Sequence, residues 1–379
     1  MIYLHHIITD LEAAGAQMML YKLLFATDRK TFKIKVTSLT NVGPVGDRIK
    51  DLGIETDSLG MKRGVPNPTG IIKLRNMLKK SPPDILQTWM YHGDLLGGVS
   101  AKLADNIPVI WGIHNTTLEP GKSKRTTIWT AKACAFLSNT IPAKIVCCSE
   151  ASKEIHVKKG YDKNKMIVIQ NGFDLNENKP DPVLRQKVRN ELNIDNKTIV
   201  IGLIARFDPQ KDHYNFLKAA SIVHSNFKNL IFLMAGDSLI WENNTLVKWI
   251  DELGIRDKCC LLGRRDDVPD LMKALDIGVL SSHYGEAFPM VIGESMASGV
   301  PCVVTDVGDS SIIVGDTGVV VPPKNPEKLA EGILKIINLE KDERLNLGNA
   351  ARQRIVENFS LEKSVKQYED IYKQIVKNK

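Results

Sequence analysis

Short apolar runs alternate with segments of helical periodicity along the first half of the chain. The runs are rich in Val and Ile, as buried strands are, while residues 16–26 and 69–80 carry apolar side chains at helical spacing. Strands that alternate with helices favour a parallel sheet and an α/β architecture. The predicted strands of this half are residues 2–8, 32–39, 84–90, 108–114, 144–149 and 166–172.

A second series of the same kind follows a polar segment, residues 174–198, that contains Pro180 and Pro182. We interpret this segment as a linker between two domains together with a surface helix. The chain ends in two predicted helices that are interrupted near Phe359 and Ser360. The predicted strands of the second series are residues 198–207, 229–237, 259–263, 276–282 and 301–306.

The two series predict two doubly wound, Rossmann-like domains that face a cleft. We assign residues 1–175 to the first domain and residues 176–360 to the second, and we expect the helix at 361–379 to pack back on the first. Ligands of such sheets bind beyond the carboxyl ends of the strands, so the candidate chemistry should lie there.

The composition, with 43% hydrophobic and 25% charged residues, is that of a soluble globular protein. No run approaches the roughly 18 apolar residues of a membrane-spanning helix. Residues 1–15 lack the basic start and long apolar core of a signal peptide, so we expect a cytoplasmic protein. The cysteines lack the CxxC spacing of zinc and redox sites, and we expect no bound metal.

Positive charge is concentrated in the first half of the chain. Residues 1–175 contain 24 Lys and Arg against 15 Asp and Glu, whereas the remaining residues contain 27 against 29. An anionic partner of the first half would explain this asymmetry, and a nucleic acid, an anionic lipid surface or a phosphorylated acceptor would each fit. A solvated basic face explains it equally well.

Polar side chains follow two predicted strands of the second half. Arg206 and Lys211 flank a turn at Asp208 and Pro209, and two cations so arranged can bind one diphosphate. Gly236 ends the next strand, where the lack of a side chain lets a ligand approach the backbone. Taken singly, these positions are also typical of surface charges and an ordinary turn.

Two glutamates lie on either side of a predicted helix start further along. The helix begins at Pro289 and Met290, and its free N–H groups, with that of Phe288, can bind phosphate or hydroxyl groups. Glu286 and Glu294 can accept hydrogen bonds from the hydroxyls of a sugar and a ribose. Alone they would be surface charges, but with the two cations after the earlier strand they describe a sugar–diphosphate–ribose ligand.

Several motifs occur in one order along the second half: "ARFDPQKDH", "MAGD", "LLGRRDDVPDLMKALDIGVLSS" and "GEAFPMVIGESMASGVPCVVTDVGD". Together they resemble the retaining glycosyltransferases of family 4, which have the two-Rossmann GT-B fold. "AAGAQ" around Gly15 resembles the glycine-rich first loop of that family, and "VIQNGFD" resembles its crossover segment. The resemblance covers essentially the whole chain, although Ala14 and Ala287 replace glycines that are usual in the family.

The resemblance implies a role for each candidate residue of the second domain. Arg206 and Lys211 would bind the donor diphosphate and stabilise the leaving group. Glu286 would hold hydroxyls of the transferred sugar, Glu294 would hold the ribose, and Arg264 lies where the family places the base. The other implied donor contacts are Gly236 and the backbone at Phe288, Pro289 and Met290.

The resemblance also implies residues of the first domain and a reaction. Gly15 would lie beside the donor phosphate and His114 near the anomeric carbon. The donor would be a nucleotide sugar, with UDP as the expected nucleotide and no separate cofactor. A hexose or N-acetylhexosamine would move, with retention and without a metal ion, to a glycan or lipid-linked glycan of a surface polysaccharide.

The first domain is expected to hold the acceptor. Trp89, Tyr91, His92 and Asp94 are candidate contacts near a strand end, although Asp94 also suits a helix cap. Residues 121–137 are basic and partly aromatic, and predict either an amphipathic element on anionic lipid or a core-facing helix with a solvated basic side. On the first alternative, a polyprenyl-diphosphate-linked acceptor is expected at the inner face of the plasma membrane.

Three other functions compete with transfer. A nucleotide-sugar epimerase with the GT-B fold would use the same donor residues without an acceptor. A non-catalytic nucleotide-sugar or RNA-binding protein would use the basic first half, but aromatic residues make up only 6% of the chain, and we expect no nucleic-acid partner. A dinucleotide dehydrogenase is disfavoured because no GxGxxG follows the first strand of either domain.

Overall fold

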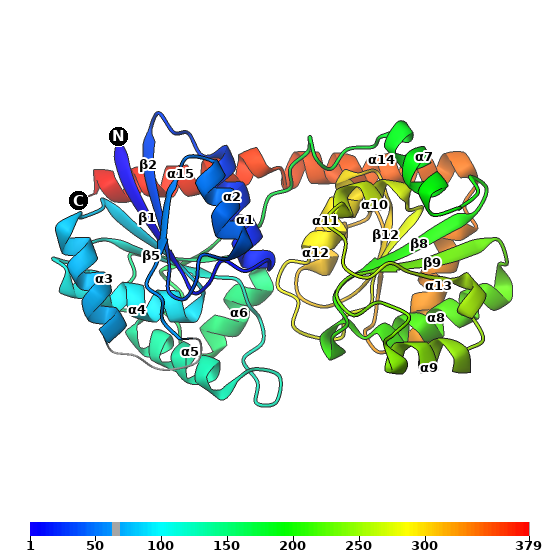
Figure 1. Cartoon of the computed structure of the whole chain (residues 1–379), viewed down its shortest axis with the longest axis horizontal. Coiled ribbons are helices and arrows are strands. Elements are labelled where there is room, and N and C mark those ends of the chain that lie inside the picture. The colour runs from blue at the N-terminus through cyan, green and yellow to red at the C-terminus, as the bar shows by residue number, and fades with distance from the viewer. Residues whose placement is uncertain (63–68, 379) are drawn as a thin grey trace. The chain divides into compact units, whose positions relative to one another are not determined.

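The computed structural model describes residues 1–62 and 69–378, and the chain divides into two compact units. Unit 1 comprises Met1–Gly172 and Leu361–Lys379, and unit 2 comprises Phe173–Ser360. In each unit a parallel sheet is flanked by helices (Figure 1). The prediction of two Rossmann-like α/β domains is confirmed.

Unit 1 is built on a seven-stranded parallel sheet with the strand order β3-β2-β1-β4-β5-β6-β7. The order reverses between β1 and β4, which creates the switch point beside which ligands bind in such sheets. The strands are β1 (Ile2–Ile8), β2 (Phe32–Ser38), β3 (Glu55–Ser58), β4 (Ile85–Trp89), β5 (Val109–Ile113), β6 (Lys144–Cys147) and β7 (Met166–Val168).

Helices cover both faces of this sheet (Figure 1). Side chains of α1, α2 and α15 pack against Leu4 and Ile8 of β1, whereas α3, α4 and α5 pack on the face to which Ile7 points. The C-terminal helix α15 therefore completes the core of unit 1. The helices are α1 (Gly15–Ala26), α2 (Gly43–Asp51), α3 (Thr69–Lys80), α4 (Met90–Leu103), α5 (Arg125–Leu137), α6 (Glu150–Lys158) and α15 (Leu361–Lys377).

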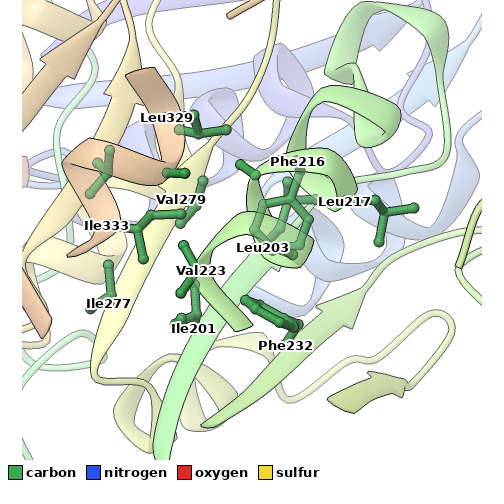
Figure 2. Close-up of a cluster of buried hydrophobic side chains, with 14 of the residues drawn as sticks. Ile201, Leu203, Phe216, Leu217, Val223, Phe232, Ile277, Val279, Leu329 and Ile333 are labelled. Atoms are coloured by element: carbon green, nitrogen blue, oxygen red, sulfur yellow. The ribbon is translucent and has the colours of Figure 1, made fainter. Parts of the chain in front are cut away.

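Unit 2 contains a six-stranded parallel sheet with the order β10-β9-β8-β11-β12-β13. Figure 2 shows part of its core, where Ile201 and Leu203 of β8 meet Phe216 of α8 and Ile333 of α13. The strands are β8 (Ile199–Ile204), β9 (Leu230–Ala235), β10 (Cys259–Leu261), β11 (Ile277–Leu280), β12 (Cys302–Thr305) and β13 (Val319–Val321). The helices are α7 (Pro182–Glu191), α8 (His213–Asn226), α9 (Asn244–Glu252), α10 (Val268–Ala274), α11 (Met290–Ala297), α12 (Ser310–Val314), α13 (Pro326–Ile337) and α14 (Lys341–Asn358).

Two features of the fold differ from the sequence-based expectation. The edge strands β3 and β13 were not predicted, because β3 has the polar sequence ETDS and β13 is a run of only three valines. Helix α7 lies at the surface as expected, but the sequence did not predict that its Arg189 side chain is fully buried and pairs with Asp276. Arg189 also donates to the Ala274 carbonyl oxygen at 3.1 Å, so α7 is anchored to unit 2.

Candidate active site

A buried ion pair joins the ends of two strands in unit 2. Lys211 ends a short 3-10 helix that follows β8, and Glu286 lies in the loop after β11. The Lys211 Nζ lies 2.5 Å from Glu286 Oε1, and the Ser282 hydroxyl donates to the same oxygen at 2.6 Å. Because Glu286 is only 7% exposed, these contacts take the place of water around its charge.

Further hydrogen bonds hold the two loops in this arrangement. The Ser281 hydroxyl donates to the Lys211 carbonyl oxygen at 2.6 Å, and the His283 backbone N–H donates to the Gln210 carbonyl oxygen at 3.1 Å. The Lys211 side chain and the Glu286 loop are therefore positioned together, although the two residues lie 75 positions apart in the chain.

Gly308, in the loop after β12, packs closely against the backbone of the Glu286 loop. Its φ is +62°, and a Cβ at this position would lie 2.3 Å from the Glu286 carbonyl oxygen. The neighbouring Asp309 N–H donates to the Ala287 carbonyl oxygen at 3.0 Å. Sequence reasoning had assigned no role to Ser282 or Gly308, although both lie within or beside motifs already recognised.

A cavity of about 180 Å³ lies at the carboxyl ends of β8, β9 and β10. Arg206, Gly236 and Arg264 all line it, because the strand order brings these three strand ends side by side. The neighbouring Arg265 is held in a two-point ion pair by Asp267, whereas the Arg264 side chain is exposed. Exposed guanidinium groups beside bare backbone form a site suited to an anionic ligand.

The two cations predicted to act on one anion have separate partners. The Arg206 Nε lies 3.1 Å from Asp208 Oδ2, and the Arg206 side chain is 56% exposed. Lys211 instead pairs with Glu286. The structure therefore brings Arg206 to the cavity and Lys211 to the buried carboxylate.

At Gly236, in the cavity wall, the backbone passes close to that of Ala205. The φ of Gly236 is +148°, and a Cβ would lie 2.1 Å from the Ala205 carbonyl oxygen. Its own N–H donates to the Gly263 carbonyl oxygen at 2.8 Å, which ties the end of β9 to the end of β10. A larger residue would have to displace the backbone at the mouth of the cavity.

Helix α11 begins where the sequence predicted. Its N-cap residue is Pro289, whose side chain cannot cap, so the first N–H groups of the helix keep their capacity to bind a ligand. The Phe288 ring packs between Phe173 and Phe359, at centroid distances of 5.9 and 5.7 Å. Only the backbone of Phe288 remains for ligand contact, while Glu294 lies half-buried one turn into the helix.

In unit 1, His114 follows β5 and stacks on Trp89. The ring centroids are 4.8 Å apart, with an interplanar angle of 19°. The Trp89 indole also stacks on Tyr368 of α15, and its N–H donates to His6 Nδ1 at 3.2 Å. Burial lowers the pKa of His114 to about 4, and its buried Nε2 has no hydrogen-bond partner among the residues described.

Three of the four expected acceptor contacts lie in the core of unit 1. Trp89, Tyr91 and Asp94 are 0%, 2% and 0% exposed. This corrects the expectation that their side chains line the acceptor site. Trp89 is buried at the end of β4, and Tyr91 and Asp94 are buried on the inner face of α4. His92 is half-buried and remains the one candidate of the four with an accessible side chain.

Tyr91 and one carboxylate oxygen of Asp94 form hydrogen bonds within unit 1. The Tyr91 hydroxyl lies 2.7 Å from His156 Nε2. Asp94 accepts hydrogen bonds from the Thr88 hydroxyl at 2.5 Å and the Gly112 N–H at 3.3 Å. Burial raises the pKa of Asp94 well above its usual range. Since Asp94 lies within α4, it is not a helix cap either.

Gly15 is the first residue of α1, after the loop that follows β1. A Cβ at Gly15 would meet nothing within 4 Å, and the N-cap Ala14 makes no side-chain hydrogen bond. Gln17 Nε2 donates to the buried Asp10 Oδ1 at 2.8 Å, which ties the helix to the preceding loop. The N-terminus of α1 is therefore an open end of a helix, of the kind that binds anions.

Two further kinds of feature, metal-binding clusters and membrane-spanning helices, concern the part of the chain that the structure describes. Within residues 1–62 and 69–378, no group of three or more His, Cys, Asp or Glu side chains is arranged to hold a metal ion. Over the same ranges, every helix is too short or too polar to cross a membrane.

Comparison with protein families accounts for both units. Residues 3–177 match the family described as "Glycosyltransferase Family 4", and residues 185–354 match "Glycosyl transferases group 1". The fold and the donor-type site thus define a glycosyltransferase of two Rossmann-like domains. The chain belongs to the family 4 glycosyltransferases with the GT-B fold.

Individual relatives agree with this assignment. The chain is 28% identical over 320 residues, covering 82% of this chain and 80% of the relative, to an Escherichia coli UDP-Gal:alpha-D-GlcNAc-diphosphoundecaprenol alpha-1,3-galactosyltransferase. A putative glycosyltransferase EpsF of Bacillus subtilis is 23% identical over 310 residues, covering 79% of this chain and 78% of the relative. The structure of Anabaena Alr3699/HepE in complex with UDP has the same fold, with a TM-score of 0.86, 22% identity and coverage of 99% and 100% of the two chains.

Replacement of Gly236 should damage the cavity more than the fold. In Gly236→Ala, the new Cβ would push the end of β9 away from Ala205, and we expect nucleotide affinity to fall by about tenfold or more. Calorimetric titration with UDP measures this effect. Gly254→Ala is the matched control, because Gly254 also has a positive φ of +64° but no atom within 4 Å of a new Cβ. Equal UDP affinities of the two variants would contradict the assignment of the cavity.

Buried histidines should make unit 1 sensitive to acid. Burial lowers the pKa of His5, His114 and His156 to about 4 and that of His6 to about 3, against 6.5 for the ordinary group. These histidines are therefore protonated below about pH 6.5 in the unfolded chain, but only below about pH 4 in the folded chain. Stability should fall over this interval, by about 2 kcal/mol for each histidine between pH 8 and pH 5.

Urea unfolding at several pH values, followed by tryptophan fluorescence, measures this loss. His114→Gln removes one of the titrating groups, so the fall in the free energy of unfolding should be shallower in that variant. A free energy of unfolding that stays constant between pH 7 and pH 5 would contradict the prediction.

Proposed function

We propose that the enzyme transfers a hexose or N-acetylhexosamine from a UDP-sugar to a lipid-linked glycan, with retention of anomeric configuration. The observation that carries the proposal is the cluster of Lys211, Ser282 and Glu286. It lies at the same carboxyl edge of the unit 2 sheet as the cavity lined by Arg206 and Arg264. Together they supply hydrogen-bond acceptors for a sugar and cations for a diphosphate within one unit.

The donor chemistry of relatives supports UDP as the nucleotide. The Escherichia coli relative is named for transfer from UDP-Gal, and the Anabaena structure was solved with UDP. In the proposal, Arg206 and Lys211 bind the diphosphate, Arg264 lies by the base and Glu294 holds the ribose. Glu286, with the backbone N–H groups of Phe288 and Met290 as neighbours, holds hydroxyls of the sugar.

The proposed mechanism is stabilisation of the leaving diphosphate by preorganised cations. The buried Lys211 is held by Glu286, so its ammonium needs little reorganisation when negative charge develops nearby. The acceptor hydroxyl attacks the face from which the diphosphate departs, and the diphosphate takes the acceptor proton. In this scheme positioning and charge stabilisation supply the catalysis, and no metal ion is required.

From unit 1, the proposal assigns His114 to the anomeric centre and the N-terminus of α1 at Gly15 to the donor phosphate. A neutral imidazole with an unpartnered Nε2 can donate or accept a single hydrogen bond to a sugar hydroxyl. Stacking on Trp89 restricts the orientation of that ring. We therefore treat Trp89 as a residue that positions His114.

The proposed acceptor is a glycan on a polyprenyl diphosphate, used at the inner face of the plasma membrane. The name of the Escherichia coli relative specifies a diphosphoundecaprenol-linked acceptor, and the positive charge of residues 1–175 suits an anionic diphosphate. His92 is the candidate acceptor contact that the fold leaves accessible.

A panel of UDP- and GDP-sugars tests the donor assignment. We expect the true donor to raise the melting temperature and to be hydrolysed slowly to UDP and free sugar, because binding to the folded state alone stabilises it. Product stereochemistry by NMR, with a short-chain polyprenyl-diphosphate glycan as acceptor, then tests retention. If the enzyme converts the donor to an epimer when no acceptor is present, the assigned activity is epimerisation and not transfer. If only GDP-sugars raise the melting temperature, the assignment of UDP as the nucleotide is wrong.

Lys211→Ala should reduce turnover by about 10²-fold or more, since it removes a cation from the leaving group. EDTA should leave wild-type activity unchanged. Lys248→Ala, whose side chain is 73% exposed on α9, is the control for loss of one positive charge. Lys211→Ala also leaves the buried Glu286 carboxylate without its cation, so the melting temperature of this variant is measured together with its activity. The double variant Lys211→Ala with Glu286→Gln removes both charges and so lacks the cation without leaving an unpaired carboxylate. EDTA-sensitive transfer, or full activity of the double variant, would contradict the mechanism.

A further inference from the structure

Helix α5 of unit 1 carries a line of exposed basic and aromatic side chains. Arg125, Trp129, Lys132 and Phe136 recur at intervals of four, three and four residues, which places them along one face of the helix. All four are exposed, and Trp129 and Phe136 are 69% and 84% exposed. We call these four residues the α5 stripe.

The opposite face of α5 is already used by the fold. Ala131, Cys134 and Ala135 are buried against α4 and the sheet, in the cluster that contains Trp111 and Ile145. Figure 1 shows α5 beside α4 on this face of the sheet. The stripe therefore adds nothing to the core of unit 1, and its two large aromatic rings lie in contact with water. Such exposure is typical of a surface that binds a partner.

The charged residues of helix α5 itself are all basic. Helix α5 contains no acidic residue, and the Lys132 Nζ lies 5.1 Å from the centroid of the Trp129 ring. Just beyond the helix, the Lys165 Nζ donates to the Asn139 carbonyl oxygen at 2.6 Å. Burial lowers the pKa of Lys165, against the charge of Asp162, and the positive charge of Lys102 lowers it further. Two more lysines thus lie near the end of α5 that carries Phe136.

We propose that the α5 stripe docks unit 1 on an anionic lipid surface. Aromatic rings prefer the boundary between headgroups and acyl chains, and Arg and Lys beside them reach anionic headgroups. A lipid surface offers partners for both kinds of side chain, acyl chains for the rings and anionic headgroups for the cations. A membrane partner also agrees with the lipid-linked acceptor of the proposed function, and this one argument rests on that proposed function.

Vesicle binding tests the proposal on the full-length chain. We expect co-sedimentation with vesicles of phosphatidylcholine containing about one-third phosphatidylglycerol, and little with phosphatidylcholine alone. Trp129→Ala with Phe136→Ala should lower the vesicle affinity by about tenfold or more, and Arg125→Glu with Lys132→Glu should abolish it. Because all four side chains are exposed, the variants should keep the wild-type melting temperature.

Phe25→Ala is the matched control, since Phe25 is 57% exposed on α1, which packs on the other face of the same sheet. It should bind vesicles as the wild type does. Trp129 provides a second measurement: anionic vesicles should shift the emission of the wild type to shorter wavelength, and this shift should be lost in Trp129→Phe. Hydrolysis of the UDP-sugar without acceptor should be unchanged in every stripe variant, which separates failure of docking from failure of the proposed function.

Three results would overturn the proposal. The first is equal binding to vesicles with and without the anionic lipid. The second is unchanged vesicle affinity of the aromatic and charge-reversal variants. The third is a wild-type oligomer, measured by light scattering without lipid, that the aromatic variant converts to monomer, because the stripe would then join two copies of the chain.

Discussion

A buried carboxylate needs a partner, and in unit 2 this requirement organises the site. Glu286 is nearly excluded from solvent, and Lys211 and Ser282 supply the contacts that water would otherwise make. For these groups to meet, the loops after β8 and β11 must lie side by side, which the order of the parallel sheet ensures. Gly308 then supports the backbone of Glu286 from the neighbouring loop. The same arrangement presents a cation and a carboxylate at the carboxyl edge of the sheet.

The corresponding constraint in unit 1 is an aromatic stack. The Trp89 ring stacks on both His114 and Tyr368, so a histidine at a strand end and the C-terminal helix contact the same side chain. The stack excludes water from His114, which keeps its imidazole neutral. The last helix of the chain is therefore part of the support of a candidate catalytic group. This relation joins residues of the first and last parts of the sequence within one compact unit.

Sequence reasoning succeeded where the signal is local or where several motifs occur in a fixed order. The period of the apolar positions predicted the central strands of both sheets, and the motif order predicted a family 4 glycosyltransferase, which the family comparisons confirm. It missed the edge strands β3, which is polar, and β13, which comprises only three residues. It also assigned Trp89, Tyr91 and Asp94 to a binding surface, because a residue near a strand end can point outward or inward. The direction depends on where the following helix begins.

The sequence by itself determined the two-domain α/β class, the start of α11 and the identity of the charged residues near the strand ends. These follow from periodicity, from proline geometry and from residue chemistry, all of which are local properties. Tertiary structure decided that Lys211 pairs with Glu286 while Arg206 pairs with Asp208, and that Asp94 is buried while Trp129 is exposed. Pairing and burial depend on which distant elements the packing brings together, and no short stretch of sequence carries that information.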